Sequence, residues 1–304
     1  MRRWLLALAP AAWVLPIATA LAQPVTNGTA AAGDPAVIAL VNASDQVICT
    51  AAVIGPHTAI TAGHCVGGRD PRTLRIFIGS TLGEAGTFIA VSDARTHPQF
   101  DPGGRDIAMM TLRESAPVAP LELAGPVDAS LVGTMIRVVG FGLTAGNLSD
   151  AGIKREGTAR IAAVRTEELI AVPDPSLSCL GDSGGPALLP AGTIGGVVSR
   201  VDSLCVDHAV YTRIDIAQDP LIQPYLAETA PGAAGEGEPC FYAAHCTAGL
   251  ECRGDAETFC ESPAGCGCAS TATATPAAFL VVLVVLVGLA IMRRRPVCVS
   301  ARPR

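Results

Sequence analysis

The segment SCLGDSGGP, residues 178–186, constrains the fold more than any other stretch of this chain. Four of its nine residues are glycine or proline, so neither a regular helix nor a regular strand fits here. Glycines on both sides of Ser183 allow the backbone to turn sharply and to approach another part of the molecule closely. Ser183 is therefore a candidate nucleophile carried on a tight turn.

The chain begins with a segment that is typical of a targeting signal rather than of a folded domain. Two arginines precede an apolar run from Trp4 to Leu15, and Ala20 and Ala22 are the small residues that a signal peptidase reads. We interpret residues 1–22 as a secretory signal peptide. An N-terminal membrane anchor is the alternative, but the apolar run is short and interrupted by proline.

A second apolar segment lies near the end of the chain. Residues 277–292 are uncharged and rich in valine and leucine, the uncharged stretch 269–276 extends them as a linker, and three arginines follow. This pattern predicts a transmembrane helix with 293–304 as a basic cytoplasmic tail, which places the residues between the two apolar segments outside the cell. A buried core helix is the alternative reading.

The charge of the exported part excludes one class of partner. The chain has 21 basic and 27 acidic residues, and seven of the basic ones lie in the terminal segments. The remainder holds fourteen basic against 27 acidic residues, a formal net charge of −13. A negative net charge disfavours binding to the negatively charged phosphate backbone of a nucleic acid, so we expect no nucleic-acid partner.

The cysteines divide the exported part into two regions. Cysteines of exported proteins form disulfides more often than they bind metal. Four of the eleven are spread over the first region and six crowd into residues 240–268, namely Cys240, Cys246, Cys252, Cys260, Cys266 and Cys268. A zinc site at His245 with three of these cysteines is a weaker alternative. Between the regions, the glycine- and proline-rich residues 229–239 are predicted to be a linker.

Residues 25–228 have the pattern of an all-β domain. Short runs such as AVIALV, TLRIFIG, TMIRVVGFG and TIGGVVS are separated by glycine, proline and aspartate turns. Only residues 216–227, at the end of this region, suggest a helix. We therefore expect a sandwich or barrel that ends in one short helix.

The serine turn fits two kinds of serine hydrolase. GDSGG also satisfies the G-x-S-x-G motif of α/β-hydrolases, whose acid and histidine follow the serine in a chain of alternating strands and helices. This chain has no such alternation after Ser183. It has instead TAGHC, with His64, and DIAMM, with Asp106, both upstream of the serine.

TAGHC, DIAMM and GDSGGP together resemble the three signature segments of the chymotrypsin-like (trypsin-fold) serine peptidases. The resemblance covers residues 25–228 and includes VVGFG, where Phe141 stands in place of the family's usual tryptophan. Gly63 replaces the usual alanine, and the interval from Asp106 to Ser183 is short. The resemblance implies two six-stranded antiparallel β-barrels with the active site between them.

The roles that this resemblance implies agree with the chemistry of the side chains. Ser183 would be the nucleophile, His64 its general base, and Asp106 the group that holds the imidazole tautomer. The backbone N–H groups of Gly181 and Ser183 would form the oxyanion hole. No cofactor and no metal are expected.

The same resemblance implies two disulfides and a specificity pocket. Cys49 would pair with Cys65, beside the histidine, and Cys179 with Cys205, at the walls of the pocket. The pocket would have Leu177 as its floor and Ser199, Val201 and Ala209 in its wall. Without a carboxylate on the floor, cleavage after arginine or lysine should be poor, and Val201 should favour small aliphatic residues. Asp202 and Asp207 are the residues that could reverse this preference.

The family resemblance also implies how the enzyme is activated. In the family, a freed aliphatic N-terminus pairs with the aspartate before the nucleophile, which would be Val25 pairing with Asp182. Signal cleavage after Ala22 leaves residues 23–24 as an activation dipeptide, so the first exported form would be a weakly active zymogen. The alternative is that Gln23 is the mature terminus and other donors satisfy Asp182.

The tail resembles two further families. The first four cysteines of 240–268 resemble small disulfide modules of secreted bacterial proteins, with three pairings open. GCGC, the apolar segment and the arginines resemble the tripartite sorting signal of myxobacterial surface proteins, in which the helix is removed and Cys266 or Cys268 would be processed. A permanent single-span anchor is the alternative.

These observations predict a serine endopeptidase that is exported, is tethered to the bacterial surface or outer membrane or is released, and acts on polypeptides as a monomer. The alternatives are a non-catalytic adhesion or binding protein on the same scaffold, or a serine esterase.

Overall fold

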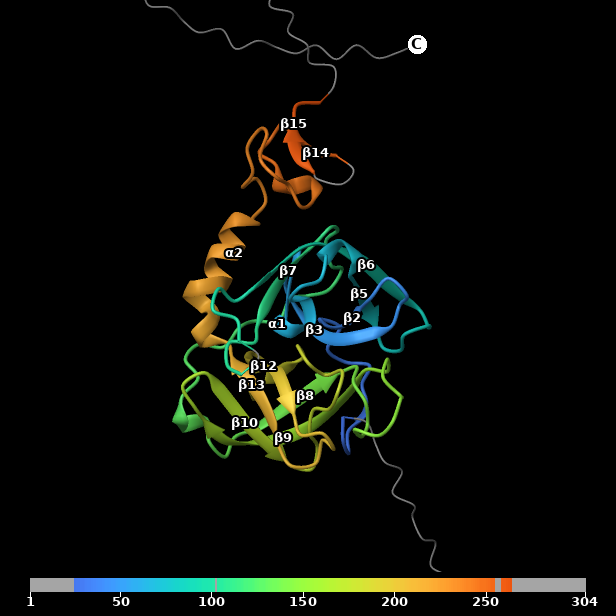
Figure 1. Ribbon diagram of the computed structural model, residues 1–304, viewed down its shortest axis with the longest axis vertical. Coiled ribbons are helices and arrows are strands. Elements are labelled where there is room, and N and C mark those ends of the chain that lie inside the picture. The colour runs from blue at the N-terminus through green and yellow to red at the C-terminus, as the bar shows by residue number, and fades with distance from the viewer. Residues whose placement is uncertain (1–24, 102, 255–257, 264–304) are drawn as a thin grey trace, which may run out of the picture. The chain divides into compact units, whose positions relative to one another are not determined.

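The computed structural model describes residues 25–101, 103–254 and 258–263, and these form two compact units, the first ending at Ala230 and the second beginning at Pro231 (Figure 1). The expected signal peptide, activation dipeptide, sorting cysteines, apolar segment and basic tail lie outside the described residues. Among the helices that the structure does describe, none has the length and apolar character needed to cross a lipid bilayer.

The first unit begins with a closed antiparallel barrel. Its strands follow the order β2-β3-β4-β7-β6-β5 around the barrel. Their bounds are β2 Val37–Val41, β3 Val47–Gly55, β4 Thr58–Thr61, β5 Arg75–Gly79, β6 Gly86–Thr96 and β7 Ala108–Leu112. Two short helices, α1 Gly63–Val66 and η1 Pro71–Thr73, connect β4 to β5.

The apolar run in β2 is buried on both of its faces. Successive side chains of a strand point to opposite sides. Ile38 and Leu40 join the main core, whereas Ala39 and Val41 pack with Phe77 in a second cluster. This explains why the run is continuously apolar rather than alternating.

The second barrel contains the six strands β8 to β13, with the short β1 at its edge. Its sheet has the order β1-β9-β10-β13-β12-β11-β8, and a further pairing of β8 with β9 closes it. The bounds are β1 Thr29–Ala30, β8 Met135–Gly140, β9 Arg155–Val164, β10 Glu168–Pro173, β11 Pro186–Leu188, β12 Ile194–Val201 and β13 Ala209–Arg213, with the turn η2 Ala129–Leu131 before β8. The prediction of two six-stranded antiparallel barrels is confirmed.

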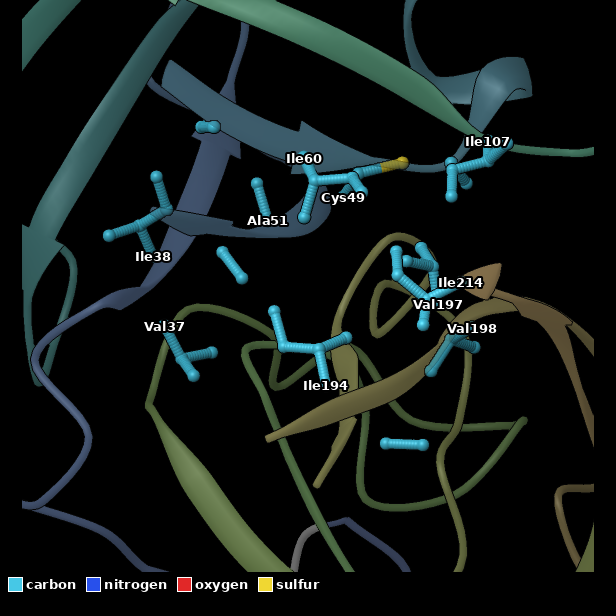
Figure 2. Packing of buried hydrophobic residues seen from close by; sticks show 14 of the residues in the cluster. Val37, Ile38, Cys49, Ala51, Ile60, Ile107, Ile194, Val197, Val198 and Ile214 are labelled. Atoms are coloured by element: carbon cyan, nitrogen blue, oxygen red, sulfur yellow. The ribbon is translucent and has the colours of Figure 1, made fainter. Parts of the chain in front are cut away.

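One apolar cluster spans both barrels (Figure 2). Ile38, Ala51 and Ile60 contribute to it from the first barrel, and Ile194 and Val197 from the second. Because the two barrels share this core, a loop at their boundary can be held from both sides.

The first unit ends in helical structure, as the sequence suggested for residues 216–227. A 3-10 turn η3 Asp215–Ala217 and a π-helical turn η4 Gln218–Ile222 lead into α2 Gln223–Glu228. The hydroxyl of Tyr225 lies 2.7 Å from Oγ1 of Thr111 in β7, which fixes this helix to the first barrel.

The second unit is small and is held by two disulfides. It contains η5 Ala243–His245 and a hairpin of β14 Glu251–Arg253 and β15 Phe259–Glu261. The bonds are Cys240–Cys252 and Cys246–Cys260. Since each of these sulfurs is used in a disulfide, the alternative of a zinc site with His245 is wrong.

Part of the segment expected to be a linker belongs to this small unit. Ala234 is buried and pairs with Cys246, and the backbone N–H of Gly237 donates to the carbonyl of Cys260 at 2.8 Å. These glycine-rich turns are therefore held by pairing and hydrogen bonds with the disulfide-bonded cysteines. Composition alone does not separate such turns from a linker.

Candidate active site

His64 and Asp106 lie together on the first barrel. His64 is in α1, directly after β4, and Asp106 lies just before β7, the strand that pairs with β4. His64 Nδ1 lies 2.7 Å from Asp106 Oδ2, and the backbone N–H of His64 donates to Oδ1 of the same carboxylate at 2.8 Å. The Asp106 side chain is 1% exposed and that of His64 is 37% exposed. One buried carboxylate therefore fixes both the backbone and the ring of a histidine that reaches solvent.

Asp106 has two further partners from the second barrel. The hydroxyl of Ser199 donates to Asp106 Oδ2 at 2.7 Å, and Thr212 Oγ1 donates to the Asp106 carbonyl at 3.1 Å. Ser199 was expected in the wall of the specificity pocket. It lies at a register shift in the β12–β13 pairing, and such bulges redirect a side chain out of the strand's alternation.

Ser183 lies on the loop between β10 and β11, at the boundary of the barrels, and is half-buried. Its carbonyl accepts a hydrogen bond from Thr50 N at 2.8 Å. Cys65 Sγ lies 3.7 Å from His64 Nε2 and 3.8 Å from the Ser183 carbonyl, so the imidazole and the serine backbone flank one sulfur atom. Among the described residues, the Ser183 hydroxyl makes no hydrogen bond to His64; such bonds often tighten only when substrate binds.

The contacts of the turn before Ser183 fix the direction of the Gly181 N–H, one of the two expected oxyanion donors. The Leu180 carbonyl accepts from Leu143 N at 2.8 Å, and in a trans peptide the N–H of the next residue, Gly181, points to the opposite side. Gly181 has φ +93°, and a Cβ there would lie 2.9 Å from the Cα of Gly142. Only glycine fits this conformation without strain.

Asp182, between the two expected oxyanion donors, is fully buried. Its carboxylate accepts from Gly142 N at 2.7 Å and from Cys179 N at 2.8 Å. The guanidinium of Arg155, also buried, lies nearby and donates to the Gly142 carbonyl at 3.4 Å. Burial raises the pKa of Asp182 to about 6, because the backbone donors and Arg155 offset the loss of water only in part.

Val25, the expected partner of Asp182, is buried in this uncut chain. A Cβ on Gly157 would lie 3.3 Å from the Val25 side chain, and Thr26 N donates to the Leu177 carbonyl at 3.0 Å. Val25 has φ +42°, a conformation that a β-branched residue rarely adopts. No hydrogen bond joins Val25 to Asp182 in the part of the chain that the structure describes.

The remaining expected pocket residues lie on neighbouring segments. Leu177 and Ala209 are buried, and Val201, half-buried at the end of β12, pairs with Ala209. Cys179–Cys205 and Cys49–Cys65 are both bonded, so the pocket wall and the histidine loop are each held by a disulfide.

The two acidic residues that could reverse the pocket's character face elsewhere. Both carboxylate oxygens of Asp202 accept backbone N–H groups of its own loop, among them Val206 N at 2.9 Å. The side chain of Asp207 is 80% exposed and lies 2.9 Å from His208 Nδ1. In the part of the chain that the structure describes, the hydrogen bonds of both carboxylates go to residues of their own loop.

Sequence reasoning did not identify Thr50 or Arg155. Thr50 follows a disulfide cysteine in β3, and no motif surrounds it. Arg155 lies in the charged run KRE, which is typical of an exposed segment. The structure instead buries its side chain beside the Gly142 carbonyl.

Comparisons with known proteins agree with this geometry. The profile of the trypsin family matches residues 25–221. A trypsin of Saccharopolyspora erythraea is 27% identical over 210 residues, which cover 62% of this chain and 92% of that protein. Snake venom serine protease rhinocerase 4 of Bitis rhinoceros is 26% identical over 210 residues, which cover 58% of this chain and 77% of that protein.

A solved structure shows the same fold. Neuropsin, a serine protease expressed in the limbic system of mouse brain, matches with a TM-score of 0.56 and 21% identity, over 63% of this chain and 95% of that chain. The family profile covers almost all of the two-barrel unit. The chain therefore belongs to the trypsin family and is a chymotrypsin-like serine endopeptidase.

Proposed function

We propose that Ser183, His64 and Asp106 form the catalytic triad of this endopeptidase. Ser183 Oγ attacks the scissile carbonyl carbon while His64 Nε2 takes the serine proton. The carbonyl oxygen becomes an oxyanion, which the N–H groups of Gly181 and Ser183 stabilise. When the tetrahedral intermediate collapses, the C–N bond breaks and the leaving amine takes the proton from His64. A water molecule then attacks the acyl-enzyme with the same proton transfers and frees Ser183.

The observation that carries this proposal is the pair of contacts between Asp106 and His64. A carboxylate at 2.7 Å from Nδ1 selects the tautomer in which Nε2 is free to accept a proton. The second contact, to the backbone of His64, fixes the position of the histidine relative to Asp106. A histidine with a structural role alone would not need a buried carboxylate behind a solvent-facing ring.

For specificity, we infer a preference for small aliphatic residues before the scissile bond. Leu177 offers no counter-charge to arginine or lysine, and the Asp202 carboxylate already accepts backbone N–H groups of its own loop. A cation buried there would lose its hydration without gaining a partner.

We further infer that the enzyme is exported and tethered to the cell surface. The four disulfides of the described residues fit an oxidising compartment. Intact mass of the surface form tests the tether. A sorting signal predicts protein that lacks residues 279–304, and a retained RRRPVCVSARPR peptide would instead indicate a permanent anchor.

The central experiment combines a fluorophosphonate probe with a peptide library on the processed, exported protein. We expect labelling of the wild type at Ser183, no labelling of Ser183→Ala, and cleavage of peptide bonds. Absence of labelling in correctly folded protein would favour the alternative of a binding protein on the same scaffold. Labelling with ester hydrolysis but no peptide cleavage would favour a serine esterase.

A further inference from the structure

Thr50, in the first barrel, contacts the turn of residues 180–183 (the oxyanion turn), which belongs to the second barrel. This residue lies in β3, next to Cys49, and is fully buried. Its hydroxyl donates to the carbonyl of Gly181 at 3.0 Å and accepts from the backbone N–H of Phe141 at 3.0 Å. Its own backbone N–H donates to the carbonyl of Ser183 at 2.8 Å. Thr50 thus holds the carbonyl group of each residue whose N–H is expected to bind the oxyanion.

We propose that Thr50 is a positioning residue for catalysis, because its hydroxyl fixes Gly181 and its backbone fixes Ser183 in the orientation that the oxyanion hole requires. This inference rests on the proposed triad and oxyanion hole. Thr50 does not touch substrate, and its effect is transmitted through the turn.

Two features make the hydroxyl hard to replace. Gly181, at φ +93°, has no side chain of its own to restrain it, so its orientation depends on the contacts of the adjacent carbonyls. The Leu180 carbonyl is held by Leu143, within the second barrel, whereas the Gly181 carbonyl is held by Thr50, from the first barrel. The hydroxyl therefore ties Gly181 to the barrel that carries His64 and Asp106, and the bond from Thr50 N to the Ser183 carbonyl ties the next part of the turn to the same barrel.

A hydroxyl also satisfies two buried groups at once. Gly181 O needs a donor and Phe141 N needs an acceptor, and one hydroxyl provides both. In Thr50→Val a methyl group would stand at hydrogen-bonding distance from both atoms, which is too close for carbon, and both would lose their partner. The turn should shift to relieve this, and the oxyanion donors should shift with it.

The test compares Thr50→Val, Thr50→Ser and the control Thr111→Val in the full processed chain. Thr111 is an equally buried threonine of the first barrel, and its hydroxyl contacts Tyr225 rather than the oxyanion turn. We measure kcat and KM on a peptide substrate, affinity for a peptide boronic acid that mimics the tetrahedral intermediate, and the thermal unfolding midpoint. Loss of one oxyanion donor costs about 10²–10³ in rate, so a displaced donor should cost about ten- to a hundredfold in kcat.

We expect Thr50→Val to lower kcat and boronic-acid affinity together, with KM changed by less than about twofold, because the ground state does not use the oxyanion hole fully. Thr50→Ser should restore both, and Thr111→Val should lose stability but keep kcat. If Thr50→Val does not fold, Thr50→Ala is judged by the same comparison with Thr50→Ser.

Two results would overturn the inference. One is a folded Thr50→Val or Thr50→Ala enzyme with wild-type kcat, and the other is a folded Thr50→Ser enzyme as impaired as these variants. A wild type that neither reacts with a fluorophosphonate nor cleaves peptides would overturn the proposed function itself, and the inference with it. An active wild type with an unaffected variant overturns the inference alone.

Discussion

Ser199 and His64 share one oxygen atom of Asp106. The Ser199 hydroxyl and the His64 imidazole each lie 2.7 Å from Oδ2, one from the second barrel and one from the first. The serine thereby limits rotation of the carboxylate that orients the histidine. We expect Ser199→Ala to lower kcat/KM by about tenfold, since a hydrogen bond to a charged group contributes about 1.5–3 kcal/mol. Steady-state kinetics check this, and wild-type values in a folded variant would show that the His64 contacts alone hold the carboxylate.

A larger effect is expected when Asp106 itself is changed. Asp106→Asn keeps the shape but can present an amide N–H to His64 Nδ1, which would select the tautomer with its proton on Nε2. The ring could then no longer accept the Ser183 proton, and kcat should fall by about 10⁴. Active-site titration must accompany the kinetics. A variant within tenfold of the wild type would remove Asp106 from the proposed triad.

The parts of this site that the sequence could predict are those carried by local motifs. TAGHC, DIAMM and GDSGGP each contain a candidate catalytic side chain together with the turn that presents it, so His64, Asp106 and Ser183 could be proposed as the triad from the sequence alone. The spacing of short apolar runs between glycine, proline and aspartate turns was sufficient to predict the all-β unit, because runs of that length between close turns are typical of strands.

Contacts that depend on how two distant segments meet were not predictable. Ser199 leaves the alternation at a bulge in β12, and a sequence pattern of period two does not locate bulges. Thr50 meets Gly181 across 131 positions of the chain, through a side chain with no motif around it. Nothing in the charged run KRE indicates that the guanidinium of Arg155 is buried next to the Gly142 carbonyl.

The proposed specificity predicts the outcome of opening the pocket. Val201 is half-buried and pairs with Ala209 at the expected pocket wall. Val201→Gly removes a β-branched side chain and should move the preferred residue before the scissile bond from small aliphatic toward larger apolar or aromatic types. Profiling both enzymes with one peptide library tests this. A wild-type profile dominated by arginine and lysine would contradict the assignment of Leu177 as the floor.

The raised pKa of Asp182 predicts how the stability of the chain that is not cleaved before Val25 depends on pH. Burial raises its pKa from an ordinary value of 3.8 to about 6, so the folded state binds the proton more tightly than the unfolded state does. The stabilising contribution is complete below about pH 4 and is lost as the pH rises through 6, a change of about 3 kcal/mol. Thermal unfolding of Ser183→Ala, which avoids self-digestion, should therefore show this loss between pH 4 and 7.

The control for that measurement is the double variant Ser183→Ala, Asp182→Asn. An amide does not titrate, so this protein should lack the Asp182 part of the pH dependence. Identical slopes for the two proteins between pH 4 and 7 would mean that Asp182 is already ionised at low pH, with Arg155 as a sufficient counter-charge.

The final prediction concerns activation and follows from the backbone of Val25. At φ +42° its branched side chain is strained, which typically costs about 1–3 kcal/mol. Cleavage directly before Val25 removes the preceding carbonyl, and with it the steric restriction on φ. It also frees an ammonium group, which by the family resemblance would pair with the buried Asp182. We therefore expect the most active fraction to begin at Val25, and protein that begins at Gln23 to be a weakly active precursor.

N-terminal sequencing of fractions ranked by active-site titration tests whether protein that begins at Val25 is more active than protein that begins at Gln23. A version with a specific-protease site inserted directly before Val25 should gain activity on cleavage in parallel with the appearance of the new terminus. The same version with Asp182→Asn should gain little, because the ammonium then has no carboxylate to pair with. Full activity in protein that still begins at Gln23 would indicate that Gly142, Cys179 and Arg155 satisfy Asp182 without the terminus. In that case the positive φ of Val25 would be a tolerated strain rather than part of an activation step.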